Sequence, residues 1–304
     1  MTDIPYQGSG PYCYANSLVM LMGNSAPDAS LVEVCTGSPF GMNLLYGKMP
    51  FFDPYGWTPE LGIDSALTAL GWTARTTSGG TAAAALDRLR SSLVDGPVLV
   101  GPLEMGHLRY QPSMTGPIGA DHYAVVLAME ADWLIIHDPQ GYPYARLPVP
   151  DFLRAWQADT VDYGEQYTMR TDVQVRASIP PSVAVRTALS WVNPAERTAP
   201  AGTLANAEAA LALADRLEHR PDDEIRENLV HFAIRVGTRR LADAAFWLAQ
   251  ADLPTAAAVT REQARLVGAL QYPLATEDVL GAAGILRELA PTYQRLREAV
   301  ADAY

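Results

Sequence analysis

Two apolar runs separated by a short polar turn constrain the fold of this chain more than any other feature. The runs are YAVVLAM (123–129) and WLIIH (133–137), and residues 130–132 (EAD) connect them. β-Branched and aromatic residues are frequent in both runs, and a three-residue connection between two such runs is typical of a β-hairpin. The two runs therefore predict two adjacent antiparallel strands.

Further strands and helices are predicted around this hairpin. The run PVLVGPL (97–103) predicts a buried strand, and residues 141–147 and 168–175 predict two more. The continuous apolar run CYANSLVMLM (13–22) predicts a buried helix that ends at Gly23. Other helices are expected at 64–70, 81–93 and 149–156, and an irregular segment rich in Gly, Pro and aromatic residues at 37–62.

The composition changes near residue 193. The stretch NPAERTAPAG (193–202) has the Pro, Gly and charge content of a linker, and Ala and Leu recur at helical spacing after it. Helices are expected at 203–219, 223–236, 238–251, 260–270, 275–289 and 291–303. The predicted fold class is α+β, with a catalytic domain at 1–192 and an all-α domain at 197–304. We expect the all-α domain to act as a lid that excludes water.

Charge and cysteine content restrict the partners and the compartment. The net charge is −12, which argues against a nucleic-acid partner because phosphates are bound by a basic face. The chain shows no signal peptide and no apolar run near the roughly 20 residues of a membrane span, so we expect a cytoplasmic protein. Its two cysteines are too few for a disulfide framework. Arginine outnumbers lysine heavily, with Lys48 the only lysine, which is typical of a GC-rich bacterial genome.

Cys13 is the predicted nucleophile. It begins the helix at 13–22, where the partial positive charge of the helix start favours a thiolate. Its backbone N–H is placed to stabilise an oxyanion, and Gln7, six residues earlier on a Gly-rich loop, could supply a second donor through its side-chain amide.

His122 is the predicted base and Asp138 the residue that orients it. His122 stands directly before the first strand of the hairpin, and Asp138 directly follows the second strand. The start of one hairpin strand and the end of the next are neighbours across the ladder. Asp138 should therefore reach the far ring nitrogen of His122 and fix its tautomer, as a catalytic triad requires.

Other assignments of these residue types are weaker. His137 should point to the opposite face of its strand, and Cys35 is expected to pack as an apolar residue. No set of His, Cys and Asp residues has the spacing of metal ligands, so no metal is predicted. The glycine-rich segments follow no P-loop or dinucleotide pattern, and no cofactor is predicted.

With these residues in view, the chain resembles the papain-like cysteine enzymes. The spacing of QGSGPYC matches the Gln-x5-Cys spacing of that superfamily, and HYAVVLAMEADWLIIHDP looks like its His and Asp strands in bacterial leader peptidases. A closer resemblance is to the butirosin-biosynthesis type of acyltransferase, through VEVCTGSPFG, PLEMGHLRYQ and DFLRAW. That family combines a papain-like N-terminal domain with a helical C-terminal domain.

The resemblance implies acyl transfer in natural-product biosynthesis, including antibiotics. Cys13 would accept an acyl group from an acyl carrier protein, whose phosphopantetheine arm is the donor, and pass it to an amine or hydroxyl, or cyclise the product. Docking of an acidic carrier would need a local basic patch, for which Lys48, Arg75 and Arg109 are candidates, or a hydrophobic patch. Predicted substrate contacts are Tyr12, Tyr14, Phe51, Phe52, Trp57, His107 and Tyr110, of which the segment 51–57 either lines an acyl channel or packs a core.

Two other functions stay open at this point. A peptidase or amidase would use the same triad with water as acceptor, although Tyr14 stands where leader peptidases usually have glycine. A binding scaffold without catalysis is the third reading, and the complete triad argues against it.

Overall fold

The computed structural model describes residues 11–193, 197–220 and 222–302, and its contacts divide the chain into two compact units. The sheet unit consists of Met1–Ala29 and Gly71–Ala177, and the helical unit of Ser30–Leu70 and Ser178–Tyr304. The expected α+β class, with antiparallel sheets and a helical C-terminal region, is confirmed. The two units do not coincide with the expected segments 1–192 and 197–304, because residues 30–70 and 178–192 pack with the C-terminal helices.

An antiparallel six-stranded sheet of order β3-β8-β4-β5-β6-β7 forms the sheet unit. Its strands are β3 (Trp72–Thr77), β4 (Val98–Glu104), β5 (Asp121–Glu130), β6 (Trp133–Asp138), β7 (Tyr142–Pro148) and β8 (Met169–Val175). The predicted hairpin is β5–β6, which closes with Glu130 opposite Trp133. Strand β3 was not predicted: WTARTT lies at the edge of the sheet, and only Trp72 in it is fully buried.

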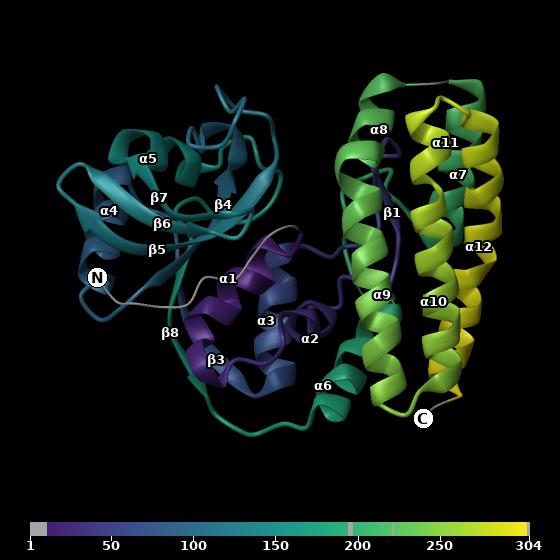
Figure 1. Cartoon of the computed structure of the whole chain (residues 1–304), viewed down its shortest axis with the longest axis horizontal. Coiled ribbons are helices and arrows are strands. Elements are labelled where there is room, and N and C mark those ends of the chain that lie inside the picture. The colour runs from purple at the N-terminus through teal and green to yellow at the C-terminus, as the bar shows by residue number, and fades with distance from the viewer. Residues whose placement is uncertain (1–10, 194–196, 221, 303–304) are drawn as a thin grey trace. The chain divides into compact units, whose positions relative to one another are not determined.

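Helices cover both faces of this sheet (Figure 1). They are α1 (Cys13–Met22), α4 (Ala82–Ser92) and α5 (Val149–Gln157). Residues of α4 and α5 share one core with strand residues such as Ala124 and Val126, whereas Met20 of α1 packs with Val125 and Leu127. Successive strand residues point to opposite faces, so α1 lies on the face opposite α4 and α5.

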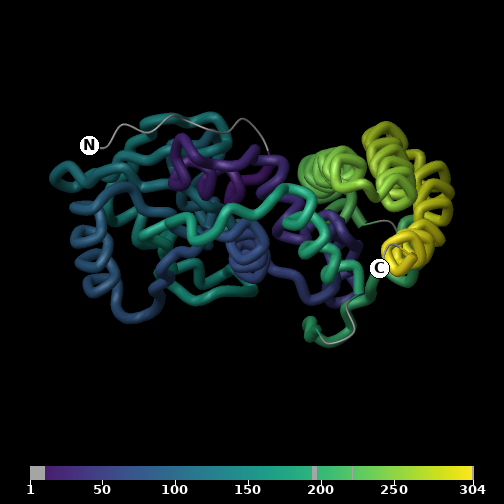
Figure 2. The backbone as a smooth tube through the Cα atoms, turned by 90° about the horizontal axis from the view of Figure 1, so that it is seen from below, coloured from purple at the N-terminus to yellow at the C-terminus, as the bar shows by residue number. Residues whose placement is uncertain are grey.

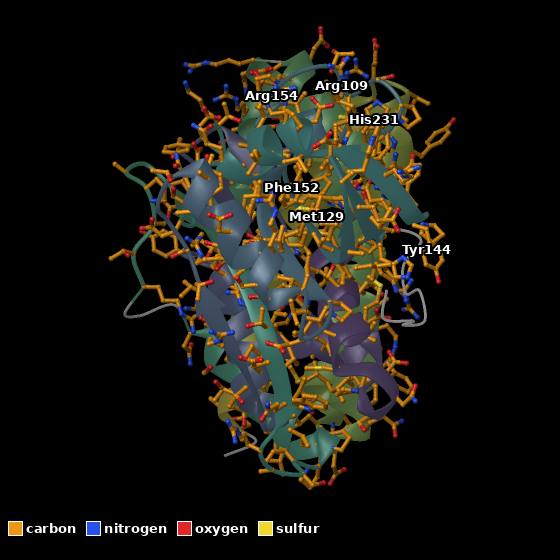
Figure 3. The ribbon with its side chains drawn as sticks, turned by 90° about the vertical axis from the view of Figure 1, so that its left-hand side faces the viewer. Arg109, Met129, Tyr144, Phe152, Arg154 and His231 are labelled. Atoms are coloured by element: carbon orange, nitrogen blue, oxygen red, sulfur yellow. The ribbon has the colours of Figure 1, made fainter. Side chains whose placement is uncertain are left out.

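Helix α5 shows how the apolar pattern places an element on the sheet. Phe152 is fully buried in the core, and the side chain of Arg154, two residues later, is 53% exposed. Figure 3 labels Phe152 near the middle of the view and Arg154 towards its top. The apolar stripe of the helix thus faces the strands and its charged residues face solvent.

The helical unit contains the remaining elements. Its helices are α2 (Ala29–Cys35), α3 (Pro59–Leu70), α6 (Pro181–Ala188), α7 (Asn206–His219), α8 (Asp223–Asn228), α9 (Ile234–Gln250), α10 (Pro254–Ala269), α11 (Gln271–Ala275) and α12 (Val279–Ala301). A small sheet of order β2-β1-β9 is formed by β1 (Asn43–Leu45), β2 (Met49–Phe51) and β9 (Leu204–Ala205). Helices α7, α9, α10 and α12 pack along one another, and Figure 2 shows this bundle, coloured green to yellow, nearly end-on.

Two helices expected at 275–289 and 291–303 form a single helix, α12, with Pro291 inside it. A proline in a helix interior costs about 3 kcal/mol because it lacks an N–H and crowds the preceding turn. Buried residues continue on both sides of it, among them Leu289 and Tyr293. Packing of this face stabilises the helix across the proline. Within the described part of the chain, none of the helices has the length and apolar character of a membrane span.

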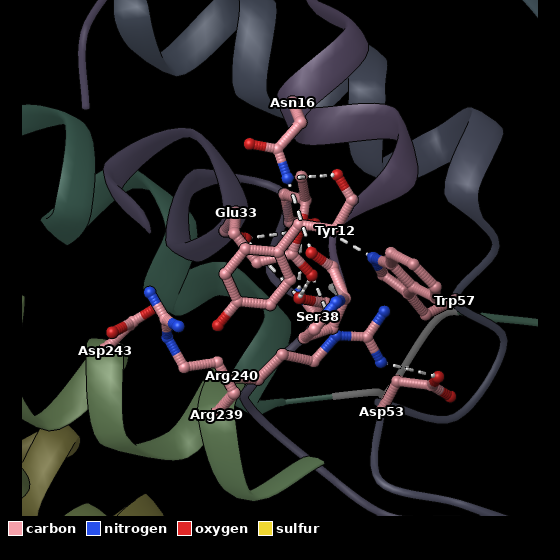
Figure 4. Close-up of polar contacts among 11 residues, drawn as sticks. Tyr12, Asn16, Glu33, Ser38, Asp53, Trp57, Arg239, Arg240 and Asp243 are labelled. Atoms are coloured by element: carbon pink, nitrogen blue, oxygen red, sulfur yellow. Dashed lines mark hydrogen bonds and ion pairs between the residues drawn. The ribbon is translucent and has the colours of Figure 1, made fainter. Parts of the chain in front are cut away.

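Residues 30–70 join the helical unit through apolar and ionic contacts. Met42, Leu44 and Phe52 belong to the same buried cluster as residues of α7, α9 and α12. Arg240 of α9 forms ion pairs with Glu33, at 2.8 Å, and with Asp53, at 3.3 Å (Figure 4). All three side chains are nearly inaccessible to solvent. These contacts join positions about two hundred residues apart in the chain. Such contacts leave no local pattern in the sequence, so the sequence predicts residues 30–70 as part of the first domain.

Replacement of Gly237 by alanine tests the packing of Phe52 on α9. A Cβ at Gly237 would lie 2.5 Å from the Cβ of Phe52, which is too close for the buried ring to remain in place. We expect Gly237→Ala to lower the free energy of unfolding by about 1–3 kcal/mol in urea titration, the usual cost of overpacking. The matched control is Gly284→Ala in α12, where a Cβ meets no atom within 4 Å and alanine should stabilise the helix by about 0.5–1 kcal/mol. Equal stabilisation by both substitutions would contradict this packing.

Candidate active site

Cys13 is presented at the start of α1 by a tight turn. It is the first residue of the helix and is partly exposed. The preceding residue, Tyr12, has a left-handed backbone with φ 82° and ψ 46°, a conformation that costs a non-glycine residue about 1–3 kcal/mol. The side-chain amide of Asn16 donates to the carbonyl oxygens of Tyr12, at 2.9 Å, and Pro11, at 3.3 Å. Asn16 therefore holds the turn that presents the thiol.

Helix α1 is fixed against β5 close to Cys13. The Ser17 hydroxyl donates to the carbonyl oxygen of Tyr123 at 3.3 Å. The ring of Tyr14 meets the ring of Tyr123 edge-on, with 5.9 Å between centroids. Tyr123 directly follows His122 in the chain, so these contacts set the distance between the helix start and the histidine.

His122 and Asp138 are in direct contact, as the hairpin register predicted. His122 is the second residue of β5 and lies opposite Leu103 of β4. Val125 pairs with His137, so Asp138 lies one position further along β6, diagonal to His122. His122 Nε2 is 2.8 Å from Asp138 Oδ1, and the two side chains are 1% and 0% exposed. A carboxylate accepts this bond, so Nε2 carries the proton and Nδ1 is the nitrogen that remains.

The charges around His122 favour its protonated form. Burial is the largest influence on its pKa and lowers it, but the charge of Asp138 and its hydrogen bond raise it. A hydrogen bond and charge interaction with Cys13 raise it further, and the pKa of His122 ends well above its ordinary value. Since Nε2 is bonded to Asp138, Cys13 is left with Nδ1. The three side chains thus form a continuous chain from thiol to imidazole to carboxylate.

In the described part of the chain, four hydrogen-bond donors hold Asp138 as an anion. Oδ1 accepts from His122 Nε2 and from the backbone N–H of Gln140, both at 2.8 Å. Oδ2 accepts from the Tyr110 hydroxyl and the Gln111 side-chain amide, both at 2.7 Å. Burial by itself would raise the pKa of Asp138, but the charge of His122 and these hydrogen bonds lower it from 3.8 to about 2. The carboxylate therefore stays ionised beside the histidine.

Sequence reasoning missed several residues that shape this site. The bond from the Tyr110 hydroxyl to Asp138 was not expected, and a contact of Tyr110 with substrate stays a prediction. Gln111 and Asn16 were assigned no role. A signal for Asn16 existed, since a polar residue interrupts the apolar run 13–22 one helical turn after the cysteine. No local pattern distinguishes Gln111 from any other loop glutamine.

The remaining predicted residues of the sheet unit have other surroundings. Gln7 lies outside the described residues. The side chains of Tyr12 and Tyr14 are buried, and His107 ends a short 3₁₀ turn, Met105–His107. His137, weighed as an alternative base, accepts a hydrogen bond from the Tyr144 backbone N–H at its Nδ1, 3.2 Å away.

Phe51, Phe52 and Trp57 belong to the helical unit. Phe52 lies in its apolar core, and the indole N–H of Trp57 donates to the carbonyl oxygen of Thr36 at 2.9 Å. Packing explains the burial of both aromatic side chains, and their contact with substrate stays a prediction. Of the expected docking cations, Arg75 is paired with Asp172 at 2.8 Å.

The second cysteine has a different environment from Cys13. Cys35 is fully buried in the helical unit, and burial raises the pKa of its thiol to about 12. A thiol in this state is a poor nucleophile. Within residues 11–193, 197–220 and 222–302, no group of three or more His, Cys, Asp or Glu residues is arranged to hold a metal ion.

Comparison with known proteins finds similarity to YobF. Residues 200–301 match the family model described as the YobF C-terminal domain. The chain is 35% identical over 164 residues to an uncharacterized protein, YobF, of Bacillus subtilis (strain 168), an alignment that covers 52% of each protein. The chain thus spans about half the length of this curated relative. The matched family range lies within the helical unit and includes none of Cys13, His122 and Asp138.

The low pKa of Asp138 predicts a specific acid dependence of stability. A carboxyl group whose native pKa is depressed adds stability that is complete above its ordinary pKa and is lost as the pH falls through the native value. A fall of the Asp138 pKa from 3.8 to about 2 corresponds to a contribution of about 2 kcal/mol to the free energy of unfolding. His122 is protonated in both the folded and the unfolded state in this range, so it does not contribute.

We therefore expect the stability difference between the wild type and Asp138→Asn to shrink by about 2 kcal/mol from about pH 5.5 to about pH 2, as measured by urea unfolding. Asp172→Asn is the control, because its pair with Arg75 is exposed and should be worth less than about 1 kcal/mol at any pH. A difference for Asp138→Asn that does not vary with pH would contradict the ionised, four-donor carboxylate.

Proposed function

We propose that this protein is a papain-like cysteine acyltransferase with Cys13 as nucleophile, His122 as general base and acid, and Asp138 as the residue that orients His122. The observation that carries the proposal is the chain of contacts through His122, with Nε2 2.8 Å from Asp138 Oδ1 and Cys13 on its other side. The donor would be an acyl group held as a thioester on a carrier protein of the cytoplasm. The product would belong to natural-product biosynthesis, such as that of an antibiotic.

In the first half-reaction the Cys13 thiolate attacks the thioester carbonyl carbon. A bond forms between Cys13 Sγ and the acyl carbon, the C–S bond of the donor breaks, and the departing thiolate takes the proton from the His122 imidazolium. The negative charge on the carbonyl oxygen is stabilised by the backbone N–H at the start of α1, and the Gln7 amide is the proposed second donor.

In the second half-reaction the acyl group leaves Cys13. An amine or hydroxyl attacks the acyl-enzyme carbonyl, neutral His122 takes the acceptor's proton, and Cys13 departs as a thiolate. The thiolate–imidazolium pair is restored, and the net result is an acylated acceptor and a free carrier thiol. An acceptor within the acyl chain itself would make the same steps a cyclisation.

Support for transfer over hydrolysis comes from two observations. One is the sequence resemblance to the butirosin-type acyltransferases, and the other is a large second compact unit for which peptide hydrolysis has no need. A lid role for residues 197–304 stays a prediction. A peptidase or amidase with the same three residues would differ only in using water as acceptor.

Intact-mass spectrometry after incubation with a panel of acyl-carrier thioesters tests the proposal. We expect a mass increase equal to the acyl group on the wild type, its loss in Cys13→Ala, and its discharge by an amine or hydroxyl acceptor. Cys35→Ala is the matched control and should keep the adduct, because the Cys35 thiol is buried and has a pKa of about 12. Release of free acid without any preference for an added acceptor would favour hydrolysis, and an adduct that persists in Cys13→Ala would overturn the assignment.

A further inference from the structure

We propose that Tyr110 and Gln111 are positioning residues that clamp one oxygen of Asp138, so that its other oxygen stays aligned with His122. This inference rests on the proposed centre of Cys13, His122 and Asp138. Neither residue touches Cys13 or His122 through any described hydrogen bond, so their effect would pass through the carboxylate.

The geometry at Asp138 carries this inference. A carboxylate offers about four acceptor positions, two on each oxygen. Tyr110 and Gln111 fill those on Oδ2, at 2.7 Å each, while His122 and the Gln140 backbone N–H fill those on Oδ1, at 2.8 Å each. Rotation of the carboxylate would break all four bonds, so the two donors on Oδ2 oppose any turn of Oδ1 away from His122.

The loop that carries both donors is itself tied down. Tyr110 and Gln111 lie in the loop between β4 and β5, and Glu104, the last residue of β4, binds backbone groups at both ends of this loop. The carboxylate of Glu104 accepts from the backbone N–H groups of Gly106, at 3.0 Å, Ile118, at 2.9 Å, and Gly119, at 3.0 Å. It also accepts from the Thr160 hydroxyl. Both ends of the loop are thus held by one buried side chain.

Within the loop, local contacts fix the two donors. The backbone N–H of Gln111 bonds to the carbonyl oxygen of Leu108 at 2.8 Å, which forms a turn. The Tyr110 ring packs on the ring of Tyr142 of β7, with centroids 5.7 Å apart. Donors on a fixed loop lose little conformational freedom when they bind the carboxylate, so they can hold its orientation.

Two roles for these donors must be distinguished. In the first role, they do no more than satisfy the buried charge of Asp138. Their loss would then lower the free energy of unfolding and leave the proton affinity of His122 unchanged. As positioning residues, they keep Asp138 against His122, and their loss would let the imidazolium give up its proton more readily. The second role therefore changes the balance between thiolate–imidazolium and thiol–imidazole at Cys13, which is measurable.

Other ionisable groups near the pair must be kept constant in such a measurement. Asp121 neighbours His122 on β5 and accepts a hydrogen bond from the Tyr163 hydroxyl at 2.6 Å. Glu104 lies opposite Asp121 on β4. The other ionisable side chains on α1, β5, β6, β7 and the loop between β4 and β5 are Cys13, Tyr14, His107, Arg109, Tyr110, Tyr123, Glu130, His137, Tyr142, Tyr144 and Arg146.

The test is the rate at which iodoacetamide alkylates Cys13, because only the thiolate reacts. The wild type sets the reference ratio of the rate near pH 6 to the rate near pH 9. In the double variant Tyr110→Phe/Gln111→Met, the ratio of the rate near pH 6 to the rate near pH 9 should fall below the wild-type value, by up to about tenfold for a tenfold loss of proton affinity at His122. The rates are compared only where circular dichroism shows folded protein at both pH values, because an unfolded chain exposes ordinary thiols that react mainly near pH 9 and would lower the ratio by themselves.

The single variants show whether the two donors act on one oxygen. Either donor alone still holds Oδ2, so each single substitution should lower the ratio by less than half of the logarithmic effect of the double variant. Tyr110→Phe removes a single oxygen atom, and it should shift the ratio in the same direction if the double variant does not fold. Tyr163→Phe is the matched control, since it removes a phenol–carboxylate bond next to His122 without touching Asp138.

An unchanged ratio in the double variant, or an equal fall in Tyr163→Phe, would overturn the positioning role. The measurement needs no acyl donor, so its outcome is separate from that of acyl transfer. A failure of every acyl-carrier donor together with the expected ratios would reject the proposed reaction and keep the clamp. Alkylation near pH 6 that persists in Cys13→Ala would reject the proposed centre and the clamp with it.

Discussion

The burial of Asp138 as an anion is the constraint on which the rest of the candidate site depends. A carboxylate with no exposure to solvent must receive its stabilisation from the protein. Here that stabilisation comes from the hairpin, through His122, from the turn after β6, through Gln140, and from the loop before β5, through Tyr110 and Gln111. The position of the histidine, and so of the thiol beyond it, follows from this arrangement.

The part of the site predicted from sequence is the part that local rules determine. Apolar runs around a three-residue turn establish the hairpin, and strand register then brings His122 to Asp138. The helix at Cys13 has the bounds that its apolar run predicted. The residues that were not predicted depend on three-dimensional contacts. Gln111 lies in a loop without periodicity, 27 residues before Asp138 in the chain. Nothing in the sequence around Gln111 marks it as a donor to that carboxylate.

The same distinction explains the errors in the fold. The edge strand β3 has a weak pattern because it is paired on one side only. Residues 30–70 were assigned to the first domain by composition, but Phe52 and Glu33 find their packing and ionic partners in the C-terminal helices. The sequence predicts a break between two helices at Pro291, but tertiary packing keeps the helix continuous across this residue. In each case a contact distant in sequence overrides a local preference.

Among the described residues, two buried groups of charged side chains differ in their chemistry, one around Arg240 and one formed by His122 and Asp138. In the helical unit, Arg240 neutralises Glu33 and Asp53, and a guanidinium stays charged over the whole accessible pH range. Such a set holds segments together but cannot exchange a proton at neutral pH. In the sheet unit the partner of Asp138 is an imidazole, which can both hold and release a proton, and its other side meets a partly exposed thiol. A buried carboxylate that needs only neutralisation can be paired with arginine, as in the helical unit, so a histidine beside Asp138 supports the proposed proton transfer.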